Sequence, residues 1–390
     1  MPHTPAPTVR RLGWLHFWND FTLDFITPLL PTGVPVAWLG LMEGAADGVA
    51  QVLKLFTGRA SDRSGKRAAW VATGYAGNAF FRPLAGVGVL LAWPAWIVVC
   101  RIGDRLGKGL RGSATDALTA DWTPEEARAT TYARMRTMDH LGATIGALAA
   151  AGAVALWQGQ AQIGWMICAL AVPAVAMLWL TRGLSDVEVV TPKNAAPAGW
   201  WPADKPTRQA VAVVSLAGLG AKVGPLLILA HVADIADPAT RWPLWQICLG
   251  WAALALVQAV ASSVAGWGAD KLGATGFLRF GWLVGAAVFA ALAFASGPWL
   301  IVAGLAWGLL AGFTEGAEKT VIAAAAPKTE RATAFGAMGL LTAITGLVGS
   351  AAVGFGLAWY GGLIFALPAV ALVLSALVLA RPQSAAQPQS

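Results

Sequence analysis

The stretch that decides the fold is Arg101–Asp121, which reads RIGDRLGKGLRGSATDALTAD in an otherwise apolar chain of 390 residues. It continues an apolar run, LLAWPAWIVVC, that is typical of a membrane-crossing helix. Each charge at a bilayer centre costs roughly 2.5 to 3.5 kcal/mol. On a helix, six of its charged residues share an arc of about 140°. That face must therefore look into protein or water. Its residues are Arg101, Asp104, Arg105, Lys108, Arg111 and Asp116.

The composition indicates a membrane protein with many spans. The chain is 57% hydrophobic and 12% charged, with a mean hydropathy of +0.62. A soluble domain carries about twice that share of charge. The net charge of +7 is spread over many short loops, which favours membrane topology over nucleic-acid binding. The three cysteines lie in apolar runs without metal-ligand spacing, so we interpret them as core residues.

Twelve helical spans separated by turn signals are predicted, which makes this an all-α membrane protein. Loops on one face hold nearly all the basic loop residues, and the other face holds only Arg241. The positive-inside rule then places both termini in the cytoplasm. The spans are 12–35, 39–61, 68–90, 93–120, 126–157, 160–182, 208–232, 242–268, 273–296, 298–325, 329–358 and 361–380.

The chain repeats itself in two halves. GRASDRSG at 58–65 has a counterpart, GWGADKLG, at 266–273 with the same internal spacing. Pro124 and Arg128 recur as Pro327 and Arg331, 203 residues later. We therefore predict two pseudo-symmetric bundles of six transmembrane helices around a central cavity. The expected boundaries are 1–182 for the first bundle, 183–207 for a cytoplasmic linker and 208–390 for the second bundle.

These motifs resemble those of the major facilitator superfamily. GRASDRSGKR at 58–67 resembles the loop signature GxLaDRxGRK, and RLGKG at 105–109 resembles the fourth-helix signature RxxQG. The resemblance implies a secondary transporter that works by alternating access. NDFTLDFITPLLP and TEGAEK are also similar to an exporter-like bacterial branch. Ala114-Thr115 and Ala147 depart from the Pro-Arg pair and the antiporter proline of that branch.

In the family, the loop after the second span is a latch for the outward-facing state, so the resemblance implies that role here. The alternative is an ordinary positive-inside loop. The recurrence of its spacing in the second half favours the latch. The residues that we assign to it are Gly58, Asp62, Arg63, Gly65, Arg67, Gly266 and Asp270.

Five intramembrane carboxylates are candidates for proton coupling. Asp20 and Asp24 lie one helical turn apart on the first span, and such a pair suits proton or cation binding. The alternative is an ion pair with a basic residue of the fourth or fifth span. Asp47 lies deep in the second span. Glu315 and Glu318 share one face of the tenth span, at repeat-related positions to the basic fourth span.

Basic residues outnumber acidic ones on the fourth span. They are balanced either by carboxylates of other helices or by an anionic substrate. By resemblance, Arg105 corresponds to the arginine that proton-driven members use near the cavity. We expect Arg105 and Lys108 to act against carboxylates of the first and tenth spans. The candidates for the cavity or the substrate site are Arg101, Arg105, Lys108, Arg111, Asp116, Lys222 and Lys319.

The sequence contains no catalytic triad, phosphate-binding loop or metal-spaced cluster, so we predict no enzyme activity, no cofactor and no metal. The expected function is proton-coupled efflux of a small organic solute across a bacterial cytoplasmic membrane, in contact with lipid and not with nucleic acid. Two alternatives stay open: a proton-coupled uptake symporter for an organic anion, and a non-transporting assembly factor or sensor with this fold.

Overall fold

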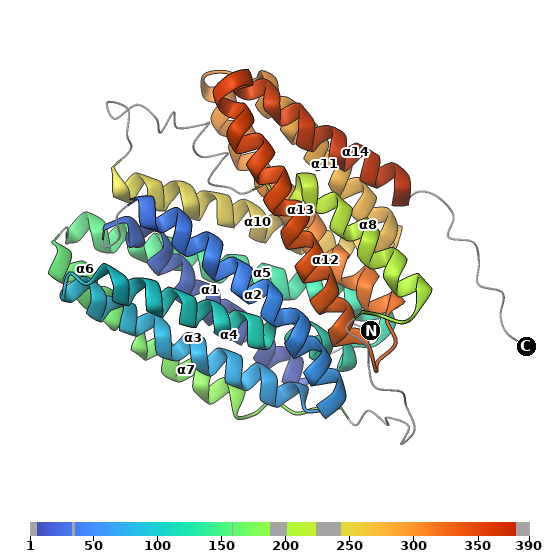
Figure 1. Cartoon of the computed structure of the whole chain (residues 1–390), viewed down its shortest axis with the longest axis horizontal. Coiled ribbons are helices and arrows are strands. Elements are labelled where there is room, and N and C mark those ends of the chain that lie inside the picture. Colours follow the sequence, from blue (N-terminus) through green and yellow to red (C-terminus); the bar gives the residue numbers. More distant parts are fainter. Residues whose placement is uncertain (1–5, 33–35, 158, 188–200, 224–242, 380–390) are drawn as a thin grey trace, which may run out of the picture.

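A computed structural model describes residues 6–32, 36–157, 159–187, 201–223 and 243–379. The helices of the first half are α1 (Pro7–Ile26), α2 (Val36–Ser64), α3 (Arg67–Leu90), α4 (Pro94–Asp121), α5 (Arg128–Leu156), α6 (Gln160–Cys168) and α7 (Ala171–Thr181). Those of the second half are α8 (Lys205–Ala221), α10 (Leu244–Leu272), α11 (Ala274–Phe294), α12 (Pro298–Ala325), α13 (Arg331–Tyr360) and α14 (Ala366–Leu379). Within the described residues the chain forms no strand, and the all-helical class is confirmed (Figure 1).

Most expected spans agree with the helices to within a few residues, and two differ for reasons of proline chemistry. The first helix ends at Ile26, and a 3₁₀ helix, Thr27–Thr32, follows it. Pro28 and Pro31 each lack the N–H that an α-helix would need there. The span 160–182 consists of α6 and α7, which are separated at Ala169 and Leu170. Pro173 cannot donate to the carbonyl of Ala169, which lets the chain break. The predicted span 208–232 extends beyond the described residues, which stop at Val223.

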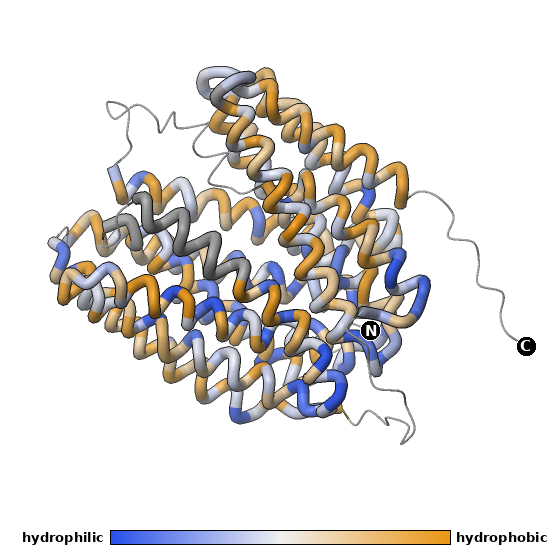
Figure 2. The backbone as a smooth tube through the Cα atoms, viewed as in Figure 1, coloured by the Kyte–Doolittle hydropathy of each residue, from blue (hydrophilic) through white to orange (hydrophobic). Residues whose placement is uncertain are grey.

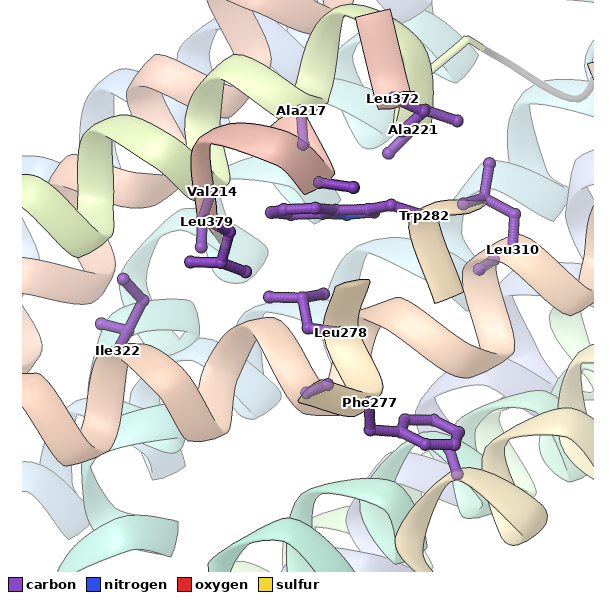
Figure 3. Packing of buried hydrophobic residues seen from close by; sticks show 14 of the residues in the cluster. Val214, Ala217, Ala221, Phe277, Leu278, Trp282, Leu310, Ile322, Leu372 and Leu379 are labelled. Carbon is purple, nitrogen blue, oxygen red and sulfur yellow. The ribbon is translucent and has the colours of Figure 1, made fainter. Parts of the chain in front are cut away.

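The helices form two bundles, one from each half of the chain. In the first, α1 packs on α5 and α3 packs on α4; in the second, α11 lies between α12 and α14, and α8 packs on α13. Trp282 of α11 is fully buried among side chains of α8, α12 and α14, including Ala217 and Leu310 (Figure 3). The bundles meet where α10 lies along α5 and where α13 crosses α2.

The exterior is apolar, as a lipid-facing surface requires. Large side chains such as Trp165, Val172 and Phe355 are exposed on the outside of the helices. A water-facing surface would not carry so many of them. Seven helical segments of the described chain are long and apolar enough to span a membrane. The charged face of α4 keeps that helix out of this group. Hydrophilic residues gather at the end of the molecule near the N-terminus (Figure 2).

Close contact between the bundles depends on glycine at two positions. A Cβ on Gly58 of α2 would lie 2.4 Å from the carbonyl oxygen of Ala332, and a Cβ on Gly336 of α13 would lie 2.7 Å from that of Lys54. Neither distance accommodates a side chain. Because Gly58 and Gly336 have no side chain, the backbones of the end of α2 and the start of α13 can lie in contact.

Candidate functional site

Asp62, at the end of α2, reaches across to the other bundle. Its carboxylate accepts hydrogen bonds from the backbone N–H groups of Ala332 at 3.2 Å and Thr333 at 2.7 Å, and from the Thr333 hydroxyl at 2.8 Å. It thereby caps the first turn of α13, where free N–H groups and the helix dipole favour an anion. Asp62 also pairs with Arg67 at 2.9 Å. One side chain therefore joins the loop to both bundles.

Arg67 extends this network. Its Nε lies 2.8 Å from the Asp121 carboxylate, and its Nη2 donates to the Lys328 carbonyl at 2.7 Å. Arg331 of α13 pairs with the other oxygen of Asp121 at 2.6 Å. These side chains are almost fully buried. We call this end of the molecule, held by Asp62, Arg67, Asp121 and Arg331, the closed end.

The other assigned latch residues have simpler positions. Gly65 adopts a φ of +64°, which a glycine allows, and turns the chain between α2 and α3. Arg63 is exposed. Gly266 of α10 faces α5, where a Cβ would lie 3.0 Å from that of Ala133. The side chain of Asp270 lies outside the described residues.

Asp104 of α4 is the centre of a polar cluster within the first bundle. It pairs with Arg82 of α3 at 2.7 Å and with Arg101 at 3.7 Å, and it accepts a hydrogen bond from Asn78 at 2.7 Å. The Arg111 Nε–H donates to the side-chain amide oxygen of Asn78 at 3.0 Å. Arg111, predicted as a cavity residue, thus helps to hold α4 to α3. The pair between Arg101, also a predicted cavity residue, and Asp104 lies within α4.

Two predicted residues pair with each other across the bundles. Lys319 of α12 lies 2.5 Å from Asp116 of α4. They are repeat-related, 203 residues apart. Two equivalent positions can touch only beside the axis that relates the repeats, so this ion pair lies next to that axis, between the bundles. The opposite charges expected on these two helices meet here.

A second cross-bundle bridge joins Glu315 of α12 to α5. Glu315 lies 3.3 Å from Arg136 and 3.8 Å from His140. Arg136 also pairs with Asp139 of its own helix at 2.8 Å. Asp139 lies 2.7 Å from His16 of α1. A continuous polar chain therefore runs from α1 through α5 to α12.

Within the described residues the two carboxylates of α1 have neutral hydrogen-bond partners and no ion pair, unlike the carboxylates described above. Asp20 accepts a hydrogen bond from Asn19 at 2.6 Å, and Asp24 accepts one from the Trp251 indole of α10 at 2.9 Å. Neither has a cationic partner within the described part of the chain. In contrast, Glu318 pairs with Lys222 at 3.4 Å inside the second bundle.

The partners of three predicted site residues, Asp47, Arg105 and Lys108, are not established. The side chain of Asp47 lies outside the described residues. Arg105 is buried in α4, and Lys108 is half-buried one turn later. Both make contacts, so the predicted interaction with carboxylates of the first and tenth spans stays a prediction.

Four residues of these networks carry no site assignment from the sequence: Asn78, Asp121, Arg136 and Trp251. The signal for Arg136 was its charge inside an apolar span. Trp251 gave none, because a tryptophan in a membrane helix is unremarkable in sequence.

Residues 12–221 match the model of the Major Facilitator Superfamily. An uncharacterised protein of Mycobacterium tuberculosis is 28% identical over 350 residues, covering 86% of this chain and 81% of the relative. An uncharacterised MFS-type transporter of Methanocaldococcus jannaschii is 27% identical over 146 residues, which is 36% of each chain.

Solved structures of the same fold cover nearly the whole chain. The E. coli fucose:proton symporter superposes with a TM-score of 0.77 at 13% identity, over 95% of this chain and 97% of the symporter. The human organic anion transporter TETRAN gives 0.75 at 15% identity, over 96% and 99%. A bacterial homologue of the iron transporter ferroportin, in an outward-facing state, gives 0.67 at 17%, over 95% and 98%. Identities this low carry the fold and not the substrate.

Proposed function

Because the chain belongs to the Major Facilitator Superfamily, we propose that it is a proton-coupled secondary transporter that exports a small organic solute by alternating access. The observation that supports proton coupling is the kind of hydrogen-bond partner that Asp20 and Asp24 have. Every other carboxylate described on the membrane helices pairs with a cationic side chain. Asp20 and Asp24, in contrast, accept hydrogen bonds only from neutral donors among the described residues. They can take up and release a proton without breaking an ion pair.

Asp24 connects proton uptake to the contact between the bundles. Its bond with Trp251 joins α1 to α10, and a hydrogen bond to a charged acceptor is stronger than one to a neutral acceptor. Protonation of Asp24 therefore weakens a cross-bundle contact. Asp20, one turn away, is the second proton site of the proposal.

Within this proposal we assign the conformation to the outward-facing state, because the end of the molecule that carries the latch is closed. We place both termini in the cytoplasm by the positive-inside rule, so that in this proposal the closed end faces the cytoplasm and the latch of residues 58–67 is engaged. Opening to the cytoplasm requires the Asp62 and Arg331 contacts to separate. The Lys319–Asp116 and Arg136–Glu315 bridges rearrange in the same step, since each joins the two bundles.

The test uses the purified full-length chain in liposomes that contain a pH-sensitive dye. A panel of organic anions, cations and neutral solutes is tested. We expect that the transport of at least one of them is accompanied by proton movement in the opposite direction. Movement of both in the same direction would establish uptake symport and refute export. If no solute in a broad panel crosses the membrane, the non-transporting alternative replaces transport.

Asp20→Asn with Asp24→Asn tests the proton carriers. We expect this double variant to lose proton movement while retaining solute exchange between equal concentrations on both sides, because exchange needs no net proton transfer. The matched control is Glu126→Gln, which changes an exposed carboxylate in the short 3₁₀ helix Glu125–Ala127 between α4 and α5. Proton movement at the wild-type rate in the double variant would refute the assignment.

A further inference from the structure

A groove opens on the outside of the first bundle, between the beginnings of α1 and α5. Its volume is about 190 Å³, and its lining includes Arg10, Gly13 and Trp14 of α1 and Arg134, Met135 and Met138 of α5. None of the carboxylates and bridging residues described above lines this groove; Arg136 is a neighbour of Met135 in sequence but is not part of the lining. Neither the latch nor the proposed proton sites use it.

Two cations face this groove without a counter-ion. Arg10 and Arg134 are both exposed. In the described part of the chain, neither guanidinium has an ion pair or a hydrogen bond. They lie about 5 Å and about 9 Å along the axis from the starts of their helices. A side chain at that depth reaches the lipid headgroups while its aliphatic stem stays in the apolar layer.

The floor of the groove is apolar. Met135 is buried and Met138 is half-buried beside it. Gly13 lies opposite, and a Cβ there would contact both methionines at 3.8 Å, so the missing side chain keeps the groove open. Trp14 is 51% exposed at the edge, the position that tryptophan favours where lipid meets water. The site therefore combines a basic rim with an apolar floor.

We infer that this groove binds one anionic phospholipid, with its phosphate between Arg10 and Arg134 and an acyl chain over Met135 and Met138. Basic pockets between membrane helices recognise such headgroups, and a guanidinium binds a phosphate through two hydrogen bonds. A soluble anion would use the arginines and leave the methionine floor uncovered. A bound lipid covers both features. Because α1 and α5 belong to the same bundle, the lipid braces that bundle.

The experiment measures lipid binding to the full-length protein in detergent. Native mass spectrometry and thermal unfolding are recorded with phosphatidylglycerol, with phosphatidylcholine and with inorganic phosphate. We expect phosphatidylglycerol to bind and to raise the unfolding temperature, whereas the other two do so weakly. Arg10→Ala with Arg134→Ala should weaken phosphatidylglycerol binding about 30-fold, the combined effect of two surface cations.

Two further variants separate a built site from general surface charge. Gly13→Leu fills the groove and leaves the charges in place, and we expect it to weaken phosphatidylglycerol binding as well. Arg208→Ala removes an exposed cation at the start of α8 and should change nothing. The proposal would be overturned if Arg208→Ala weakened phosphatidylglycerol binding as much as Arg10→Ala with Arg134→Ala does. It would also be overturned if inorganic phosphate raised the unfolding temperature as much as phosphatidylglycerol.

Discussion

A single buried carboxylate, Asp62, contributes much of the closure at one end of the molecule. It caps α13 and neutralises Arg67. Removal of one partner from a buried pair costs about 3 to 5 kcal/mol. We predict that Asp62→Ala shifts the population toward opening at this end. Spin labels at the exposed positions 63 and 328 should then show longer distances in pulsed electron resonance, and Glu126→Ala should leave them unchanged. Unaltered distances in Asp62→Ala would contradict the latch.

At the scale of an element, α5 depends on glycine where it packs on α1. A Cβ on Gly146 would lie 2.3 Å from the Phe21 carbonyl oxygen, whereas a Cβ on Gly152 of the same helix meets nothing within 4 Å. We therefore predict that Gly146→Leu destabilises the protein by at least the 1 to 3 kcal/mol or so of an overpacked core. Gly152→Leu is the control. Thermal unfolding in detergent should show a lower midpoint for the first variant only, and equal midpoints would show that α1 and α5 do not pack this closely.

At the scale of the whole molecule, the proposed alternating access requires the bundles to move against each other. Thr137 of α5 and Ser263 of α10 place their hydroxyl oxygens 3.1 Å apart across the interface. We predict that Thr137→Cys with Ser263→Cys, in a chain without its three native cysteines, forms a disulfide that stops solute exchange in liposomes. Reductant should restore exchange, and each single cysteine variant should be unaffected. Full exchange by the cross-linked protein would rule out relative motion at this contact.

The sequence by itself determined the fold class, because membrane physics leaves few options. Long apolar spans with few charges must be helices, and the recurrence of GRASDRSG as GWGADKLG indicated two related bundles. The confirmed fold and family rest on such local signals. The domain boundaries at 182 and 208 stay predictions. The sequence also predicts which charges lie inside the membrane, since any charge there stands out against an apolar background.

Only the tertiary structure decided which of these charges meet. Helical periodicity places residues on a face, but the rotation and depth of the neighbouring helix select the partner. Arg111 and Lys319 look equivalent in sequence as intramembrane cations. The first lies within the α3–α4 cluster, and the second forms the bridge to Asp116 between the two bundles. Asp20 and Asp24 became distinct from the other carboxylates described on the membrane helices for the same reason: packing gave these two neutral hydrogen-bond donors and gave the others cationic partners.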